Sequence, residues 1–190
     1  MKTDGWAQLY GDLVQRLPGY VQAARLTICG LSTFLDGYLR LHEAETLLNA
    51  SGETPQATLL RELSRRARAG IGGEFYMDWP EGGMWVEKNL KFSHWGLGGS
   101  GAQAAQILAI LGAPALMSLE DRGERQLSVI HPNVLVATNR GVSRCRHLST
   151  TQGRKPAHYI FEYTAGIPVG SIVPARSSRN DRTLYRRAIG

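Results

Sequence analysis

A glycine-rich turn that runs into an apolar helix constrains this chain more than any other segment. The turn reads Gly96-Leu97-Gly98-Gly99-Ser100-Gly101-Ala102, and the following residues up to Leu111 are apolar around much of the helix circumference. Such a helix is expected to be buried between layers. Gly112 ends it, and residues 113–119 are predicted to form the next strand. This order of elements is typical of an α/β protein with a mostly parallel sheet and helices on both faces.

Periodicity and turn residues predict the remaining elements. The predicted helices are residues 6–23 and two pieces within 40–69, separated at 49–52, of which the second runs from Ala57 to Ala69. The predicted strands are a buried one at 26–30 and two others at 133–137 and 157–163. The glycine- and aromatic-rich stretch from Gly70 to Gly101 is instead predicted to be loop and short strand. Its aromatic residues either line a ligand mouth or anchor the loop onto the core.

The composition is that of an ordinary globular chain. Of 190 residues, 43% are hydrophobic and 20% are charged, which is enough apolar material for the core of about one domain. No run of about 18 apolar residues occurs, so no membrane-spanning helix is predicted. The start lacks the apolar region of a secretory signal, and Cys29 and Cys145 form no disulfide framework. We therefore expect a cytoplasmic protein that does not bind membranes.

The net charge of +6 is unevenly distributed along the chain. Residues 1–139 carry 12 Lys and Arg against 14 Asp and Glu, whereas residues 140–190 carry 10 against 2. A solvated basic tail is one interpretation. The other is an anion site built from arginine, whose fork suits phosphate oxygens. The tail lacks interleaved aromatic residues that would reach bases, so a nucleic-acid partner is not favoured.

The glycine turn also fits the pattern Gly-x-Gly-x-x-Gly, through Gly96, Gly98 and Gly101. That pattern is the dinucleotide-binding fingerprint, and it leaves a dinucleotide-dependent oxidoreductase as an alternative. The fingerprint needs a buried β-branched strand before its first glycine. Residues 91–95, Lys-Phe-Ser-His-Trp, are polar and short.

Two carboxylates are candidates for ligand binding. Asp36 is expected just past the carboxyl end of the strand at 26–30, where open α/β sheets bind ligands. A turn-forming role is the alternative for such an Asp. Glu74 follows Gly72-Gly73, directly before the aromatic stretch.

These residues together resemble the ribokinase-like superfamily of sugar kinases, and within it the ADP-dependent glucokinase/phosphofructokinase family. The resemblance covers nearly the whole chain, and its elements, in chain order, are Trp6 and Tyr10 on a helix, Ile28-Cys29-Gly30 with Asp36, Gly72-Gly73-Glu74, the turn at 98–102, Ile160-Phe161-Glu162-Tyr163, and Pro174 with Arg176 and Arg179. It implies an incomplete three-layer α/β sandwich with a small lid subdomain. The implied core is residues 1–36 and 96–190, and the implied lid-like segment is residues 37–95.

The resemblance also implies roles for individual residues. The carboxylates of Asp36 and Glu74 would hold a hexose, and a carboxylate at Glu74 would repel a phosphorylated sugar, so a neutral hexose is expected. The backbone amides of Gly98 and Gly99, with the side chain of Ser100 beside them, would close over the sugar. Arg179 would face the transferred phosphate.

The sequence departs from the family in three places. Phe34 stands where the family usually has an Asn. The usual Gly-Gly-Asn/Gln-Ala-Gly reads Gly-Gly-Ser-Gly-Ala at 98–102, and the usual Arg-x-Asn-Arg reads Arg-Ser-Ser-Arg at 176–179.

The family's catalytic motifs are expected beyond the point that matches residue 190. The resemblance implies Mg²⁺ and ADP or ATP, with the catalytic base in a Gly-x-Gly-Asp turn and a metal-linked Asn-x-x-Glu motif, and neither pattern occurs in these 190 residues. We therefore expect sugar binding without turnover by the chain alone. Self-association or a second chain that supplies the rest of the domain is expected as well. A non-catalytic sugar-binding or regulatory module remains an alternative function.

Overall fold

The computed structural model describes residues 3–119, 121–151, 157–174 and 176–185, without the side chains of residues 3–4 and 178–185. The chain forms two compact units. Unit 1 consists of Met1–Thr33 and Gly98–Gly153, and unit 2 consists of Phe34–Leu97 and Arg154–Gly190. Most of the strand pairs in both units are parallel, so the predicted α/β class is confirmed.

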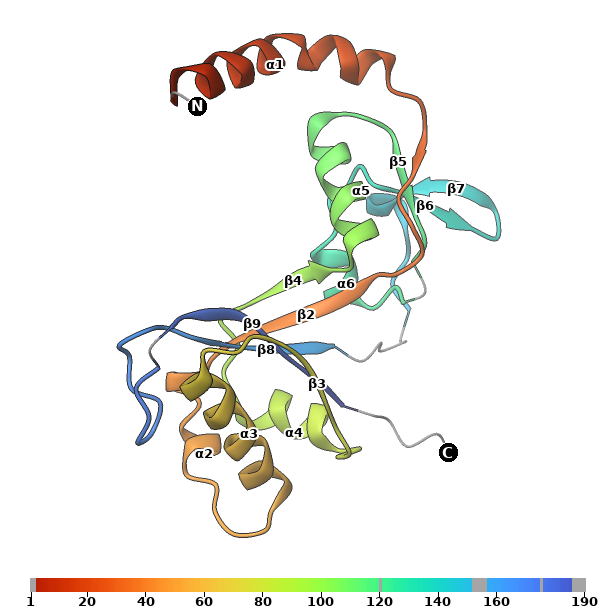
Figure 1. The fold of residues 1–190 in the computed structure, drawn as a ribbon. Coiled ribbons are helices and arrows are strands. Elements are labelled where there is room, and N and C mark those ends of the chain that lie inside the picture. The colour runs from red at the N-terminus through yellow and green to blue at the C-terminus, as the bar shows by residue number, and fades with distance from the viewer. Residues whose placement is uncertain (1–2, 120, 152–156, 175, 186–190) are drawn as a thin grey trace. The chain divides into compact units, whose positions relative to one another are not determined.

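Unit 1 is built on a four-stranded sheet with the order β1-β5-β6-β7. Its strands are β1 (Thr27–Ile28), β5 (Ala115–Met117), β6 (Leu135–Thr138) and β7 (Gly141–Arg144). The first three are parallel, and β6 and β7 form an antiparallel hairpin. Its helices are α1 (Thr3–Ala23), α5 (Ser100–Leu111), α6 (Glu124–Ser128) and the 3₁₀ turn η2 (Cys145–His147) (Figure 1).

Helix α5 confirms the helix predicted after the glycine turn, but only one of its sides is buried. Ala102, Ala105 and Ala109 are buried, whereas Ile107 and Ile110 are more than half exposed. The prediction that the helix is buried between layers was therefore wrong for the described residues. At its start, α5 lies very close to the chain after β1, because a Cβ placed on Gly101 would meet the Cys29 carbonyl oxygen at 1.8 Å.

Strand β1 is shorter and more exposed than the buried strand predicted at 26–30. It is an edge strand of two residues, and Ile28 is 72% exposed. Cys29, directly after it, is buried instead, and its backbone N–H donates to the Leu116 carbonyl. The apolar residues 26–30 therefore contribute an edge strand in which Ile28 is exposed, and Cys29 after the strand is buried.

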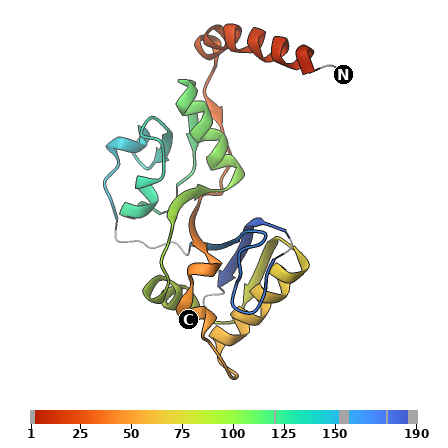
Figure 2. The same ribbon diagram turned by 90° about the vertical axis from the view of Figure 1, so that its left-hand side faces the viewer.

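Helix α1 confirms the predicted amphipathic helix, and it extends away from the rest of unit 1 (Figure 2). Its apolar residues recur at spacings of three and four, as in the seam of a coiled coil. Among the described residues little covers this stripe: Trp6, Tyr10, Leu13 and Tyr20 are between 47% and 60% exposed.

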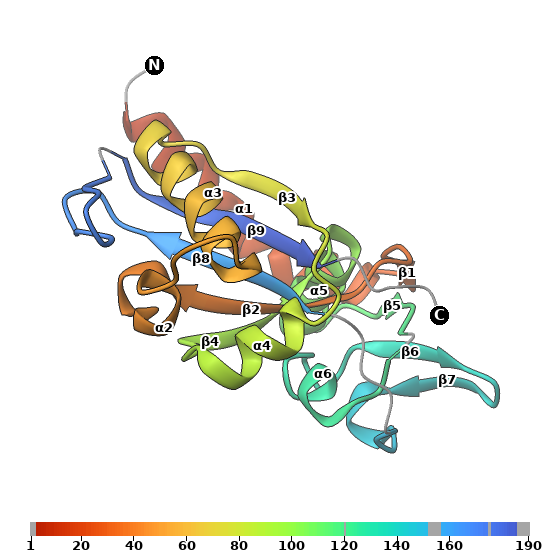
Figure 3. The ribbon, with the colours of Figure 1, turned by 90° about the horizontal axis from the view of Figure 1, so that it is seen from below.

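Unit 2 is built on a five-stranded sheet with the order β3-β9-β8-β2-β4. Its strands are β2 (Phe34–Arg40), β3 (Gly73–Met77), β4 (His94–Gly98), β8 (His158–Tyr163) and β9 (Ser178–Tyr185). The helices α2 (Glu45–Leu48), α3 (Pro55–Ala69) and α4 (Gly82–Asn89) lie on one side of this sheet, and the 3₁₀ turn η1 (Leu41–Glu43) follows β2 (Figure 3). Residues 154–190 thus complete the sheet of unit 2, while the implied division into kinase core and lid stays a prediction.

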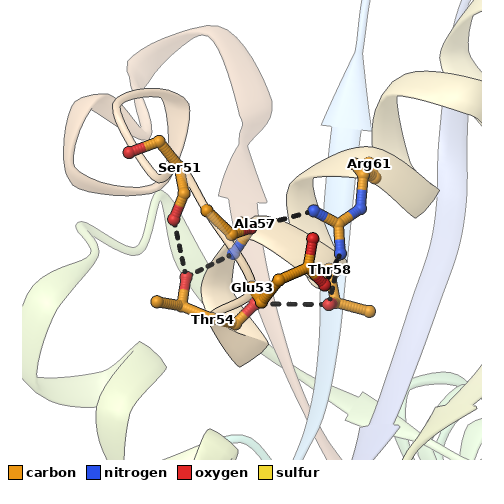
Figure 4. Close-up of polar contacts among 7 residues, drawn as sticks. Ser51, Glu53, Thr54, Ala57, Thr58 and Arg61 are labelled. Atoms are coloured by element: carbon orange, nitrogen blue, oxygen red, sulfur yellow. Dashed lines mark hydrogen bonds and ion pairs between the residues drawn. The ribbon is translucent and has the colours of Figure 1, made fainter.

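Helix α3 confirms the predicted helix and its end at Ala69, but it begins at Pro55, two residues before the predicted start at Ala57. The Thr54 hydroxyl accepts a hydrogen bond from the Ala57 backbone N–H, which caps the first turn. Arg61 reaches back to the Gly52 carbonyl and to Thr58, so the loop before the helix is tied to its first turns (Figure 4). At the other end Gly70 adopts the left-handed conformation typical of a helix C-terminus.

Helix α4 lies in the stretch predicted as loop and short strand. Its first residues, Gly82 and Gly83, disfavour helix, so local propensity does not predict it. Packing explains the glycine, because a Cβ on Gly83 would approach the Tyr159 hydroxyl at 2.9 Å. That hydroxyl also donates to Glu87 in the next turn, at 2.8 Å, and holds α4 against β8.

Candidate functional site

Asp36 lies within a strand rather than after one, which corrects the predicted position. It is the third residue of β2 and pairs in register with His158 of β8. Its carboxylate is 2% exposed, and its Oδ1 lies 3.1 Å from His158 Nδ1. Since an ionised carboxylate only accepts, Nδ1 carries the proton and donates. A buried carboxylate needs such a donor, because burial without one is costly.

His158 was not among the candidate residues, although it faces the strongest of them. Its imidazole is 12% exposed and its ring centroid lies 4.4 Å from that of Phe34. The strand position of His158 was predicted, but its partner is 122 residues away in the chain. Only the pairing of β2 with β8 brings the two side chains together.

Glu74 shares a sheet face with Asp36. The register aligns Tyr38, Ile160, residue 182 and Glu74 across β2, β8, β9 and β3. Side chains opposite one another in register point to the same face, and so do residues two apart on one strand. Asp36 is two residues from Tyr38, so both carboxylates belong to the face opposite the helices.

The neighbouring row of residues supports this assignment of faces. Gly37, Tyr159 and Phe75 are aligned in the next register position. The Phe75 ring lies under the Arg66 guanidinium of α3, 5.0 Å from its centroid, and the Tyr159 hydroxyl bonds to α4. These side chains therefore belong to the helix-covered face, and the alternation places Asp36 and Glu74 on the other one.

The two carboxylates differ in environment and are not adjacent. Asp36 is buried on β2, one strand in from the edge strand β4, whereas Glu74 is exposed on the opposite edge strand β3. Three strand spacings separate β2 from β3, or about 14 Å at the usual ~4.8 Å per strand. On the other side of Asp36's strand, Tyr38 of β2 stacks on His94 of the edge strand β4, with ring centroids 4.2 Å apart.

The other candidate residues, the glycine turn at Gly98–Ser100 and Arg179, belong to different units. Gly98, Gly99 and Ser100 belong to unit 1, where Gly99 has a φ of +94° and precedes the first turn of α5. This conformation favours glycine and lets the backbone turn sharply from β4 into the helix. Arg179 lies in β9 of unit 2, and its side chain is outside the described part of the chain.

Among the described residues, no group of three or more His, Cys, Asp and Glu side chains is arranged to hold a metal ion. No described helix combines the length and the apolar character needed to cross a bilayer. Burial raises the pKa of the Cys145 thiol, and also that of Cys29. Both thiols therefore stay protonated near neutral pH.

The family model for the ADP-specific phosphofructokinase/glucokinase conserved region matches residues 37–180. The chain belongs to this family. No curated protein sequence matches the chain at a significant level. The match covers unit 2 almost completely and includes Glu74, the turn at Gly98–Ser100 and Arg179, while Asp36 directly precedes it.

Solved structures with a similar fold are ADP-dependent kinases. A hypothetical ADP-dependent phosphofructokinase from Pyrococcus horikoshii OT3 is 16% identical, with a TM-score of 0.66 over 87% of this chain and 42% of that one. An ADP-dependent kinase complex with fructose-6-phosphate and ADPbetaS is 15% identical, with a TM-score of 0.69 over 98% of this chain and 40% of that one. A last common ancestor of ADP-dependent phosphofructokinases from Methanosarcinales is 15% identical, with a TM-score of 0.61 over 98% of this chain and 43% of that one. The chain therefore has a ribokinase-like fold and spans less than half the length of these structures.

Proposed function

We propose that this chain is the sugar-binding part of an ADP-dependent sugar kinase. The observation that carries the proposal is the buried Asp36 carboxylate, paired with His158 on the sheet face that also bears Glu74. A carboxylate held in a buried position accepts hydrogen bonds from sugar hydroxyls with a fixed geometry. His158 donates a hydrogen bond to Oδ1 of Asp36, which leaves Oδ2 to accept from the sugar. Family membership supplies the chemical class of the ligand, a sugar that accepts a phosphoryl group.

Asp36 and Glu74 lie on strands about 14 Å apart, and both side chains project from the same sheet face. In this proposal the sugar lies over that face and contacts both carboxylates. In this proposal the amides of Gly98 and Gly99 and the side chain of Ser100 close over the sugar, and Arg179 lies toward the phosphate that is transferred.

Binding of glucose to variants of Asp36 tests the proposal. We expect Asp36→Asn to weaken glucose binding at least tenfold in isothermal titration, because an amide cannot replace both acceptor oxygens of the carboxylate. Asp78→Asn is the matched control, since Asp78 is an exposed carboxylate of the same unit, beyond β3. Equal heats from the wild type and from Asp36→Asn would end the assignment of the sugar site.

Glu74 is expected to set the preference between a neutral and a phosphorylated sugar. A carboxylate near the substrate repels a phosphate dianion and accepts from a hydroxyl. We therefore expect Glu74→Gln to weaken glucose binding and to strengthen binding of fructose 6-phosphate, so that the ratio of the two dissociation constants shifts by about tenfold. An unchanged ratio would show that Glu74 does not face the sugar.

The 190 residues alone are expected to bind sugar without transferring phosphate. Phosphoryl transfer depends on a metal ion and on a base within hydrogen-bond reach of the attacking hydroxyl. The sequence holds neither a Gly-x-Gly-Asp nor an Asn-x-x-Glu pattern. A coupled assay with glucose, ADP and Mg²⁺ is expected to stay at background. Sustained turnover would contradict this part of the proposal.

Self-association through α1 forms part of the same proposal. The stripe of Trp6, Tyr10, Leu13, Leu17 and Tyr20 has the four-three spacing at which two helices interlock. Exposed apolar stripes of this kind are typical of interaction sites. We propose that α1 of a second copy of the chain packs against this stripe.

A further inference from the structure

Unit 1 contains an open pocket of about 500 Å³ that the proposed sugar site does not use. Its walls are the loop after β5, the β6–β7 hairpin and the segment that follows η2. Every lining residue lies within Gly98–Gly153, so the pocket belongs to unit 1 alone. Its size falls within the range typical of small-molecule sites.

The charged side chains that line this pocket are all basic or potentially so. Arg122, Arg140 and His147 are among the lining residues, and no Asp or Glu is. A guanidinium offers two parallel donors that match two oxygens of a phosphate. The Arg146 Nε donates to His147 Nε2 at 3.1 Å, so the proton of the neutral His147 ring is on Nδ1, which is a further donor.

Hydrogen bonds fix the backbone that carries these groups. The Thr138 hydroxyl donates to the Gly141 carbonyl at 2.8 Å and accepts from the Arg140 backbone N–H at 3.2 Å, which closes the hairpin turn. Gly141 has a φ of +111°, which the tight return of the chain requires. The Thr151 N–H donates to the Arg122 carbonyl at 3.0 Å and ties the third wall to the first. Hydrogen bonds therefore hold the backbone at Arg122 and Arg140 in place.

We propose that this pocket binds the phosphate group of a small phosphomonoester. The two guanidinium groups hold the phosphate oxygens, and the polar side chains of Asn139 and Ser143 meet the hydroxyls of the organic part. The pocket gives part of the basic excess in the second half of the chain a specific function. None of the residues that line it is among those proposed to bind the sugar.

Titration with two probes at constant ionic strength tests the proposal. The probes are inorganic phosphate and ribose 5-phosphate, followed by isothermal titration on the 190-residue chain. We expect saturable binding of both, tighter for ribose 5-phosphate, and at least tenfold weaker binding to the double variant Arg122→Ala/Arg140→Ala. Absence of saturable binding by the wild type, or equal affinities of the wild type and the double variant, would overturn it.

Two further variants separate a site from a general effect of charge. Arg144→Ala removes one positive charge from β7, as Arg140→Gln does from the pocket, but at a residue outside the pocket lining, and it is expected to change binding less than twofold. A loss equal to that of the double variant would mean a diffuse basic surface, which contradicts the proposal. Asp36→Asn should leave phosphate binding unchanged, so failure of the sugar site and failure of this pocket are distinguishable. If the double variant does not fold, Arg140→Gln at the exposed hairpin turn replaces it, with a loss of at least threefold expected.

Discussion

Replacing Gly101 with alanine is expected to lower the free energy of unfolding by more than about 3 kcal/mol, as an extreme case of overpacking. The new Cβ would lie 1.8 Å from the Cys29 carbonyl oxygen and 2.9 Å from its carbonyl carbon. These are backbone atoms, so relief requires moving the start of α5 away from the chain after β1. Intrinsic propensity acts in the opposite direction, since alanine in a helix is favoured over glycine by about 1 kcal/mol.

Urea or thermal denaturation followed by circular dichroism measures this effect. Gly11→Ala is the matched control, because Gly11 lies inside α1 and a Cβ added there would meet no heavy atom within 4 Å. That variant is expected to gain about 0.5–1 kcal/mol, as propensity alone dictates. A Gly101→Ala protein as stable as the wild type would mean that α5 does not approach Cys29 as closely as described.

The oligomeric state is expected to change when one charge is placed in the α1 stripe. We expect the wild-type chain to elute as a dimer or larger species in size-exclusion chromatography with light scattering. Leu13→Glu should shift it to monomer, because Leu13 is at the centre of the stripe and a carboxylate there would be buried against apolar side chains. Tyr10, Leu13 and Leu17 are spaced by three and four residues, as in the interface between two helices of a coiled coil, so Leu13 would contact the second copy.

Gln15→Glu adds the same charge to α1 on the side away from the stripe. It is expected to leave the oligomeric state unchanged, which separates loss of packing from simple charge repulsion. A wild-type chain that is monomeric at all concentrations would contradict the assignment of α1 as a self-association surface. Concentration dependence of the elution position measures how tightly the copies bind.

Local signals predicted α1, α3 and α5 of this chain, but not α4 or α6. Gly70 marks the end of α3, and the glycines on either side of α5 mark that helix. These features depend on backbone hydrogen bonds within a few residues, so they can be read along the sequence. Helix α4 escaped prediction because its stability comes from Tyr159, more than 70 residues away.

The position of Asp36 shows where prediction from sequence fails. The run Phe34-Leu35-Asp36-Gly37-Tyr38 has a carboxylate and a glycine at its centre, which disfavour strand. Gly37 is nevertheless required, because a Cβ there would meet the Phe92 and Trp95 rings at 2.6 and 2.7 Å. Asp36 is tolerated because His158 lies opposite. Both compensations come from distant segments and depend on tertiary structure.

The resemblance to a family predicted more of the site than the local patterns did. It indicated Asp36 and Glu74 as a pair, and the register places both on one sheet face. Whether they hold a sugar stays a prediction, as do the roles of Gly98, Gly99, Ser100 and Arg179. His158 could not have been found without the pairing of β2 and β8.

The polypeptide passes from one unit to the other three times, after Thr33, after Leu97 and after Gly153. No single cleavage or truncation can therefore release either unit intact. A fragment ending at Leu97 would contain α1 and β1 without the rest of their sheet, and β2 without β8. Isolating one unit requires a rearranged gene, in which the two segments of that unit are joined by a new linker.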